Sequence, residues 1–591
     1  MKDFMKNTYY TNIFSQTWLH AVLIALGALL AYYSAFQVPF VFDDIRQIVE
    51  NPFIRSLNNF LTWDILQKNR PFVDLTFALN YHFGGLQVYG YHLVNLIIHI
   101  LNGLLVYCLV FMVMERLVAI SNTGCDINEL RFYRWVALFT ALIFILHPLQ
   151  TQAVTYIVQR YTSLAATFYL LSVICYILAR KKQLFLKSFS SVFFFFFLSF
   201  IFGILAFLSK QSAASLPITI VLTEFLLFDR TLSGWRKKLY WIVPSLSLLI
   251  LFFFYNVGFF SGKRQLGSLL EDVSVLMRET EDISRWHYLL TQFNVIPKYL
   301  FQFIVPIGQN ADPMFPVTKS FWEGLTPLGF VFLVLLLGAG VYFLKRIPVF
   351  SFAVFWFFIT LSVESSIIPI KDTMFEHRMY LPLLGPAILV AWFATIAAKR
   401  YFYPTLVFSL SFLILFGFLT YHRNQLWQDE VALWTDSIRK NPNNYRAHTS
   451  LALSFESQNE KNKAFYHYNK ALHLNSDYAY AHLNFGAFYG EQGQLDQAEY
   501  HFRQAMKELP DNPKILSNLG VVLAQQGDFD NALELFEKAI QLDRYHIEAR
   551  INLTITLLNL QKVDQAKNEI KKILELSPDN VHAIKLLDVI K

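Results

Sequence analysis

Two adjacent carboxylates, Asp43 and Asp44, end the stretch Phe40–Asp44 directly after the first long apolar run of the chain. A charged side chain in hydrocarbon costs roughly 2.5–3.5 kcal/mol on insertion scales, so ionisable groups near a membrane often mark a substrate or ion site. A carboxylate within about 3 Å of a hydroxyl can accept its proton and activate it as a nucleophile. The pair is therefore our candidate for catalysis, with helix capping or a solvated loop as the alternative. Two neighbouring aspartates could also hold Mg²⁺ or Mn²⁺ through water, although no His/carboxylate spacing predicts a metal site.

Basic side chains within the loops between apolar runs, or beside those loops, are candidates for binding an anion. At one level of a membrane protein, such groups can hold a phosphate and stabilise it as a leaving group. The structural alternative is an anchor in the head-group layer. The phosphate-binding candidates are Arg70, Arg160, Lys210 and Arg378, and the candidates for positioning or proton transfer are His147, Gln211, Glu376 and His377. His147 with Pro148 could instead form a helix-end turn, and residues 376–378 an interfacial salt-bridge cluster.

The elements that must position these residues are membrane-spanning helices. The chain has 591 residues, of which 55% are hydrophobic and 16% charged. This balance excludes an ordinary soluble globular protein. We expect an all-α polytopic bundle with about eleven spans at 17–37, 92–114, 135–149, 157–179, 189–208, 212–228, 239–258, 326–344, 347–363, 379–398 and 402–421.

Short basic loops predict the orientation of this bundle. The loops at 180–182, 236–238, 345–346 and 399–400 fall on one side, which should be cytoplasmic together with the N-terminus. The candidate residues named above then share the outer face. The moderately apolar stretch 288–305 contains Lys298, and we expect an amphipathic or re-entrant helix against the outer surface. The basic residues are dispersed among these loops and do not indicate nucleic-acid binding.

The C-terminal part repeats itself with a period of 34 residues, as shown by Ala464, Ala498, Ala532 and Ala566. This period and the small residues that mark it predict a tetratricopeptide (TPR) array. We therefore expect a membrane domain at 1–424 and a TPR domain at 425–591, with about four repeats after a leading helix at 427–441. The concave side of such an array could hold a polypeptide, and the alternative is a solubilising cap.

The order of the motifs resembles that of the transmembrane-and-TPR O-mannosyltransferases, the TMTC family. The matching segments are Phe40–Asp44, Arg70–Pro71, Gly90–His99, His147–Arg160, Lys210–Gln211 and Glu376–Pro382, followed by the repeats. The resemblance implies a GT-C glycosyltransferase that transfers a sugar from a polyprenyl-phosphate carrier, commonly to a protein Ser or Thr, outside the membrane. It also implies that Asp43 is the base and Asp44 its acidic neighbour. The short array resembles a bacterial inner-membrane member with a periplasmic tail; a eukaryotic member would lie in the endoplasmic reticulum.

Three other functions are compatible with parts of this pattern. A non-enzymatic scaffold could use the membrane part only to display the repeats. A lipid-linked glycan ligase or polymerase would use the same donor but a glycan acceptor. A transporter is less favoured, because the charged groups lie at loop level and not at the midplane of broken helices.

Overall fold

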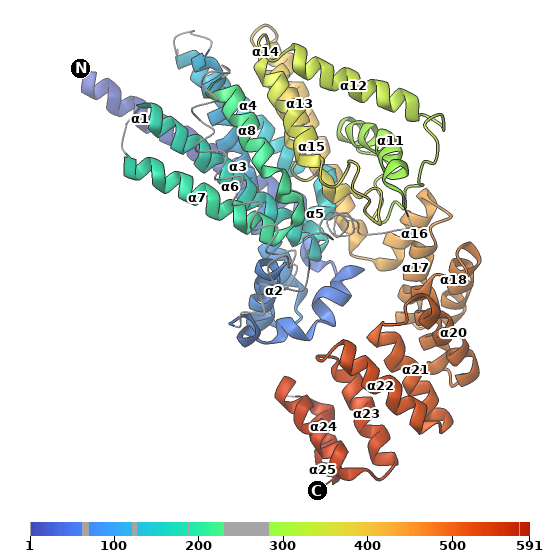
Figure 1. Cartoon of the computed structure of the whole chain (residues 1–591). Helices are drawn as coiled ribbons and strands as arrows, with labels where there is room; N and C mark the ends of the chain where they lie inside the picture. Colours follow the sequence, from blue (N-terminus) through green and yellow to red (C-terminus); the bar gives the residue numbers. More distant parts are fainter. Residues whose placement is uncertain are drawn as a thin grey trace, which may run out of the picture. The chain divides into compact units, whose positions relative to one another are not determined.

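The computed structural model of the chain describes residues 2–61, 70–120, 127–185, 189–229, 283–577 and 580–590. Over these residues the structure is helical and contains no β-strand (Figure 1). It divides into two compact units, one of Met1–Glu50 with Ile54–Asp429 and the other of Asn51–Phe53 with Glu430–Lys591. The assignment of separate functions to residues 1–424 and 425–591 stays a prediction.

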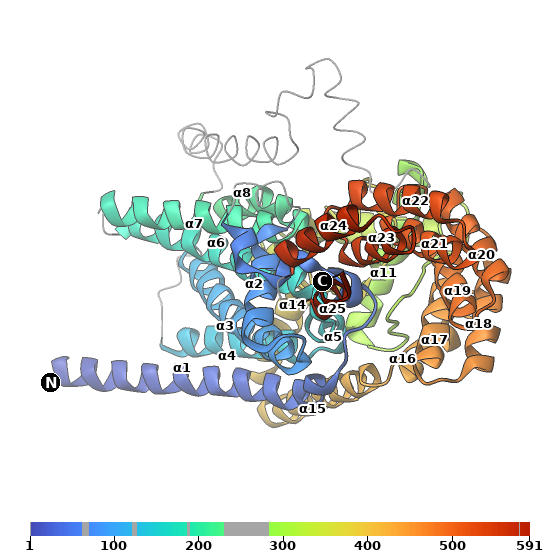
Figure 2. The same cartoon turned by 90° about the horizontal axis from the view of Figure 1, so that it is seen from below.

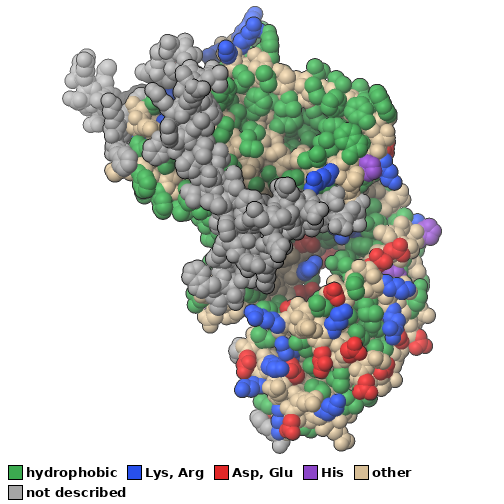
Figure 3. Space-filling model, viewed as in Figure 1, with side chains coloured by type: hydrophobic (Ala, Val, Ile, Leu, Met, Phe, Trp, Pro, Cys, Tyr) green, Lys and Arg blue, Asp and Glu red, His purple; other side chains and the backbone are tan. Residues whose placement is uncertain are grey.

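Long helices dominate the first unit, and the described part of the face seen in Figure 3 is largely apolar. Antiparallel α6 and α7 pack against each other, and α3 packs against α4 and α6 (Figure 2). The helices of this unit are α1 (Lys2–Tyr32), α2 (Pro71–Gly84), α3 (Val88–Ile120), α4 (Ile127–Leu146), α5 (Thr151–Thr155), α6 (Arg160–Phe185), α7 (Phe189–Ser209), α8 (Leu216–Leu227), α11 (Arg285–Ile304), α12 (Thr326–Tyr342), α13 (Pro348–Leu361), α14 (Leu384–Ala398) and α15 (Phe402–Trp427).

Five described helices are long and apolar enough to cross a membrane, namely Thr17–Gln37, Val88–Leu117, Ile157–Leu184, Ser190–Ser209 and Phe402–Trp427. A sixth is possible if Arg131–Leu146 and Pro148–Thr155, which meet at an angle of 54°, form one span. The prediction of about eleven spans is therefore not confirmed. Four further predicted spans correspond to shorter apolar helices, Gln211–Leu227, Thr326–Tyr342, Pro348–Leu361 and Leu384–Ala398, and the one at 239–258 lies outside the described residues.

The stretch predicted as an amphipathic helix at 288–305 is helix α11. Its inward face buries Tyr288, Gln292 and Tyr299, whereas Trp286 and Phe301 are exposed. The helix and its two-sided character are thus as predicted. Its location against the outer membrane surface stays a prediction.

A polar stripe on α3 supplies hydrogen-bond partners to the backbone carbonyl groups at the helix breaks around α5. His92, Asn95, His99 and Asn102 lie on one face of α3 and are buried. Asn95 Nδ2 donates to the carbonyl oxygens of Val154 (3.0 Å) and Ile157 (3.2 Å), and His99 Nε2 and Asn102 Nδ2 contact the carbonyls of Ile145 and Ser163. Carbonyl groups at helix breaks need such donors, especially in a membrane. The stripe therefore allows the chain to interrupt its helices between α4 and α6, where the candidate site lies.

The second unit is a helical repeat array, in agreement with the predicted period. The alanines of the 34-residue pattern are fully buried, and a Cβ on Gly486 or Gly520 would come within 2.9 or 2.7 Å of Phe502 or Phe536. Small residues are thus needed where the two helices of a repeat meet. The array follows α16 (Glu430–Lys440) with the pairs α17 (Tyr445–Ser457)/α18 (Lys461–Leu474), α19 (Ala479–Glu491)/α20 (Leu495–Glu508), α21 (Pro513–Gln526)/α22 (Phe529–Leu542) and α23 (Ile547–Asn559)/α24 (Val563–Leu576), and ends with α25 (Val581–Ile590).

One polar contact recurs between the two helices of a repeat. His482 Nδ1 lies 2.9 Å from His501 Nδ1, and His482 Nε2 lies 2.8 Å from the carbonyl oxygen of Ser476. The carbonyl can only accept, so His482 is protonated on Nε2 and His501 donates to its Nδ1. The same histidine pair occurs in the preceding repeat as His448 and His467. The equivalent positions hold two leucines, Leu516 and Leu535, in the third repeat and the ion pair of Arg550 with Glu569 in the fourth.

Candidate active site

The structure separates the two aspartates of the first loop. Asp44 is completely buried; its Oδ1 accepts a hydrogen bond from Val158 N at 2.7 Å and its Oδ2 one from Val41 N at 3.2 Å. Burial raises the pKa of Asp44 well above its usual value, and these backbone hydrogen bonds oppose the rise. Asp44 thus ties the first loop to the residues before α6. A cation bridging both aspartates would have to compete with these two hydrogen bonds.

Asp43, in contrast, is exposed. Its backbone N–H donates to the hydroxyl oxygen of Tyr156 at 2.9 Å, and its carboxylate interacts electrostatically with the same tyrosine. The preceding residue, Phe42, has a φ of 54°, a left-handed conformation that costs a non-glycine residue about 1–2 kcal/mol. Such strain often occurs at functional sites, where the surrounding structure maintains it. The turn directs one carboxylate outward while the next one is buried.

The short segment 156–162 connects the candidate residues to one another. Tyr156 contacts Asp43, and Val158 contacts Asp44. Tyr161 and Thr162 continue the segment into α6, where the Tyr161 hydroxyl donates to Asp74 at 2.7 Å and Thr162 accepts from Lys210 at 3.0 Å. Sequence reasoning had selected only Arg160 from this segment, because hydroxyl-bearing residues at a span end carry no distinctive signal.

Arg160 is buried, and its donors are engaged by neutral groups of the first unit. Its Nε donates to Asn95 Oδ1 at 2.7 Å, and its Nη1 to Asn80 Oδ1 at 2.7 Å and Thr76 Oγ1 at 3.1 Å. Its Nη2 donates to the Tyr91 carbonyl at 3.0 Å. These contacts hold α2 and α3 against the start of α6. Its assignment as a phosphate ligand stays a prediction, and its donors already have partners.

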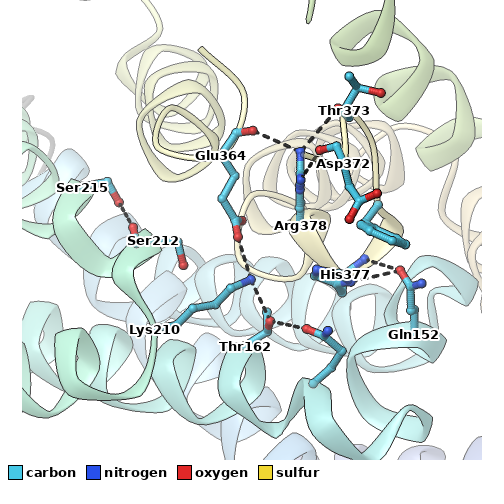
Figure 4. Close-up of polar contacts among 12 residues, drawn as sticks. Gln152, Thr162, Lys210, Ser212, Ser215, Glu364, Asp372, Thr373, His377 and Arg378 are labelled. Carbon is cyan, nitrogen blue, oxygen red and sulfur yellow. Dashed lines mark hydrogen bonds and ion pairs between the residues drawn. The ribbon is translucent and has the colours of Figure 1, made fainter. Parts of the chain in front are cut away.

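Two of the other cationic candidates, Lys210 and Arg378, both contact Glu364, a residue that sequence reasoning missed (Figure 4). Lys210 Nζ is 2.6 Å from Glu364 Oε1, in a pair whose side chains are only 9% and 14% exposed. Burial lowers the pKa of Lys210, and Glu364 opposes this change. Burial alone would raise the pKa of Glu364, but Lys210, Arg378 and Arg70 outweigh it and lower the pKa. The lowered pKa of Glu364 favours its carboxylate form, which is the form that pairs with the Lys210 ammonium.

Arg378 anchors the loop that carries Glu364. Its Nη1 donates to the carbonyl oxygen of Glu364 and the hydroxyl of Tyr288, both at 3.2 Å, and its Nη2 donates to the Asp372 carbonyl at 2.5 Å. Burial would lower the pKa of Arg378, but Tyr288 and other neighbouring groups raise it above its usual value. Arg378 therefore stays charged in the interior.

Arg70 completes this group of cations. Its guanidinium stacks over the Tyr161 ring at 4.6 Å, and its charge acts on Lys210, Glu364 and His377. Its Nε is buried without a hydrogen-bond partner among the described residues. An unpaired buried N–H of a cation is costly and favours the presence of an acceptor.

His377 and Glu376 hold a buried polar loop next to these cations. The backbone N and ring Nδ1 of His377 lie 3.0 and 3.2 Å from Gln152 Oε1, and Gln152 Nε2 donates to the Ala311 carbonyl. We assign the hydrogen of His377 to Nδ1, since Oε1 can only accept. Burial and the charges of the adjacent cations lower the pKa of His377 well below 6.5, so it is neutral. Glu376 Oε1 accepts from Asn310 N at 2.6 Å.

His147 and Gln211 do not join this cluster through the described contacts. His147 is buried; its Nε2 meets the Phe303 carbonyl at 2.9 Å, and its Nδ1 accepts from Leu149 N at 3.1 Å. This geometry matches the helix-end turn that was the alternative interpretation. Gln211 follows Lys210 and is exposed.

Glu364 could have been found by the criterion that selected Asp43. It directly follows an apolar run, 347–363, and is a carboxylate at the end of a predicted span. Tyr288 and Thr162 give no such signal, since their roles depend on which charged groups lie beside them. In the part of the chain that the structure describes, no group of three or more His, Cys, Asp and Glu residues could hold a metal ion.

Comparison with known proteins extends the resemblance to both units. Residues 477–544 and 523–587 match tetratricopeptide repeat families. The human protein O-mannosyl-transferase TMTC1 is 25% identical over 509 residues, covering 77% of this chain and 55% of that protein. A Caenorhabditis elegans protein O-mannosyl-transferase is 24% identical, covering 77% of this chain and 63% of that protein. Drosophila melanogaster Tmtc3 is 31% identical over 186 residues. The chain thus spans between about half and two thirds of the length of the first two relatives.

Proposed function

Because the chain is homologous to the TMTC protein O-mannosyl-transferases, we propose that it is a membrane-bound protein glycosyltransferase. The donor would be a sugar linked to polyprenyl phosphate, and the acceptor a Ser or Thr hydroxyl of a protein. The observation that carries this proposal is the exposed Asp43, joined through residues 156–162 to the cations Arg70 and Lys210. Arg378 holds the backbone of Glu364, the ion-pair partner of Lys210. A base and an anion site on one short segment suit transfer from a phosphate leaving group.

In the proposed reaction, Asp43 accepts the proton of the acceptor hydroxyl. The hydroxyl oxygen forms a bond to the anomeric carbon while the bond from that carbon to the phosphate oxygen breaks, and the polyprenyl phosphate leaves with the electron pair. A single displacement of this kind inverts the anomeric carbon. Lys210, Arg70 and Arg378 would stabilise the charge that develops on the phosphate. Neutral His377 would present its Nε2 as an acceptor for a sugar hydroxyl.

The topology that we propose places this site on the outer face. The four shorter apolar helices and the bent pair would also cross the membrane, and with residues 239–258 they would complete eleven spans. Hydrophobic helices that are slightly short can span by local thinning of the bilayer. The N-terminus would then be cytoplasmic and the repeats would face the periplasm, or the lumen of the endoplasmic reticulum in a eukaryotic cell. Residues 1–424 would carry out transfer, and residues 425–591 would hold the acceptor protein.

The test is sugar transfer by the full-length chain in membranes, from polyprenyl-phosphate mannose labelled in the sugar to membrane proteins. We expect Asp43→Asn to lower the rate by at least about 10²-fold, since it removes a general base. Its midpoint of thermal unfolding should stay that of the wild type, because Asp43 is exposed.

The matched control is Asp44→Asn. It replaces one carboxylate oxygen by an NH₂ group that cannot accept from Val41 or Val158, so it should lower the unfolding midpoint instead. Unchanged transfer by Asp43→Asn would remove Asp43 from the mechanism. If the labelled sugar appears in glycan and none appears on Ser or Thr, the protein is a glycan ligase.

A further inference from the structure

The ion pair of Lys210 with Glu364 lies where the proposed function needs an anion site. The Lys210 ammonium has two described partners, Glu364 Oε1 at 2.6 Å and Thr162 Oγ1 at 3.0 Å. Arg70 and Arg378 act on the same carboxylate, so three cations surround one anion. The carboxylate thereby occupies a place where the same three cations would attract a phosphate group.

Glu364 is held in place through its backbone, independently of its carboxylate. Tyr288 and Arg378 both donate to the carbonyl oxygen of Glu364, at 2.6 and 3.2 Å. The residue follows α13 in a turn, and its side chain is 14% exposed. Rotation about the side-chain bonds would therefore withdraw the carboxylate from Lys210 without breaking the contacts that hold the loop.

A second observation points to an anionic ligand in the same place. Arg70 is stacked on Tyr161, and its buried Nε has no hydrogen-bond partner among the described residues. Glu364 interacts electrostatically with Arg70 but does not accept a hydrogen bond from this Nε. A phosphate group has more acceptor oxygens than a carboxylate and could serve Lys210 and Arg70 together.

We propose that Glu364 is an exchangeable counter-ion that holds the phosphate position on Lys210 in the ligand-free protein and competes with polyprenyl phosphate for it. This inference rests on the proposed function. A sugar-linked phosphodiester carries one negative charge, whereas the polyprenyl monophosphate left after transfer carries up to two. Without competition the product would be held more tightly than the donor. The return of Glu364 to Lys210 therefore assists release of the product.

The experiment measures binding of undecaprenyl monophosphate to the full-length protein in lipid nanodiscs. Glu364→Gln keeps the size of the side chain and removes its charge, and it should lower the Kd by about tenfold. Under multiple-turnover conditions the same variant should show a lower kcat and stronger inhibition by the product. Glu364→Asp, which keeps the charge, should bind with a Kd closer to that of the wild type.

The control variant is Lys210→Met, in which Glu364 has no ammonium to compete for. Adding Glu364→Gln to Lys210→Met should change the Kd less than about twofold, because the two effects are coupled. Equal or weaker binding by Glu364→Gln would overturn the inference, and so would a full tenfold effect in the Lys210→Met background. Tighter binding cannot arise from misfolding. Equal or weaker binding counts against the inference when the midpoint of thermal unfolding of Glu364→Gln is that of the wild type, since misfolding then cannot be its cause.

Failure of this inference and failure of the proposed function are distinguishable. If the wild type transfers sugar but Glu364→Gln does not bind the lipid phosphate more tightly, only the counter-ion role is wrong. If the wild type does not bind undecaprenyl monophosphate, the proposed donor is wrong and the counter-ion role fails with it.

Discussion

Replacing Arg160 by methionine tests whether this arginine supports the fold or only binds substrate. The side chain is fully buried and reaches both α2 and α3. Methionine has a similar length and no donors. We expect Arg160→Met to lower the stability of the first unit severely. If the main role of Arg160 were to bind phosphate, the same substitution would have little effect on folding.

The expected magnitude follows from the acceptors that would lose their donor. Arg160 serves four residues, Asn95, Thr76, Asn80 and Tyr91. A buried polar group left without a partner costs about 1–3 kcal/mol, so the four together cost about 4–8 kcal/mol if some find new partners. Losses above about 4–5 kcal/mol are exceptional for single substitutions and large against a typical total of about 5–15 kcal/mol.

The assay is thermal unfolding of the full-length protein in detergent. We expect the midpoint of Arg160→Met to fall by about 4–9 °C, because an unfolding entropy of about 2.1 cal/mol/K per residue gives a unit of this size a shift of roughly 1 °C per kcal/mol. Arg46→Met, in an exposed arginine of the first loop, should stay within about 2 °C of the wild type. The reasoning would be refuted if Arg160→Met unfolded at the wild-type temperature and lost only its affinity for undecaprenyl monophosphate.

Two further predictions concern packing and pH. In α12, Gly329→Ala should destabilise the protein by about 1–3 kcal/mol, because the new Cβ would lie 2.0 Å from the Phe293 carbonyl oxygen. The control is Gly338→Ala in the same helix, where a Cβ would meet nothing within 4 Å; it should be neutral or slightly stabilising in the same unfolding assay. Burial and the neighbouring His482 lower the pKa of His501 to about 4, so the repeats bind fewer protons when folded and should lose stability as the pH falls from about 6.5 to about 4. Replacing both histidines by leucine should reduce this dependence in hydrogen exchange of the repeats; an unchanged pH profile would show that other groups cause it.

The chain organisation could be predicted from the sequence because it depends on local periodicity. The 34-residue spacing of small residues marks the contact between two neighbouring helices, and the repeats appeared at those positions. Apolar runs located the long helices. The length of an apolar run, however, does not determine the length of the helix that forms within it. This is why the eleven predicted segments include four helices that are shorter than a full span.

The candidate site was predicted only in part. Asp43, Lys210 and Arg378 lie at the ends of apolar runs and Arg70 lies in the first loop, and these positions identified groups that are costly to place near a membrane. Sequence reasoning could not distinguish Asp43 from Asp44, since both have the same neighbours along the chain. The hydrogen bond from Val158, which is 114 residues away, buries one carboxylate and leaves the other exposed.

The sequence by itself therefore determined that this is a helical protein with membrane-spanning segments and a TPR array, and where its costly charges lie. Only the tertiary structure decided which charges are paired. Lys210 meets Glu364 and Arg160 meets Asn95 because distant helices bring them together. Local patterns report which face of a helix is apolar, whereas the partner of a buried polar group depends on contacts that no short stretch of sequence contains.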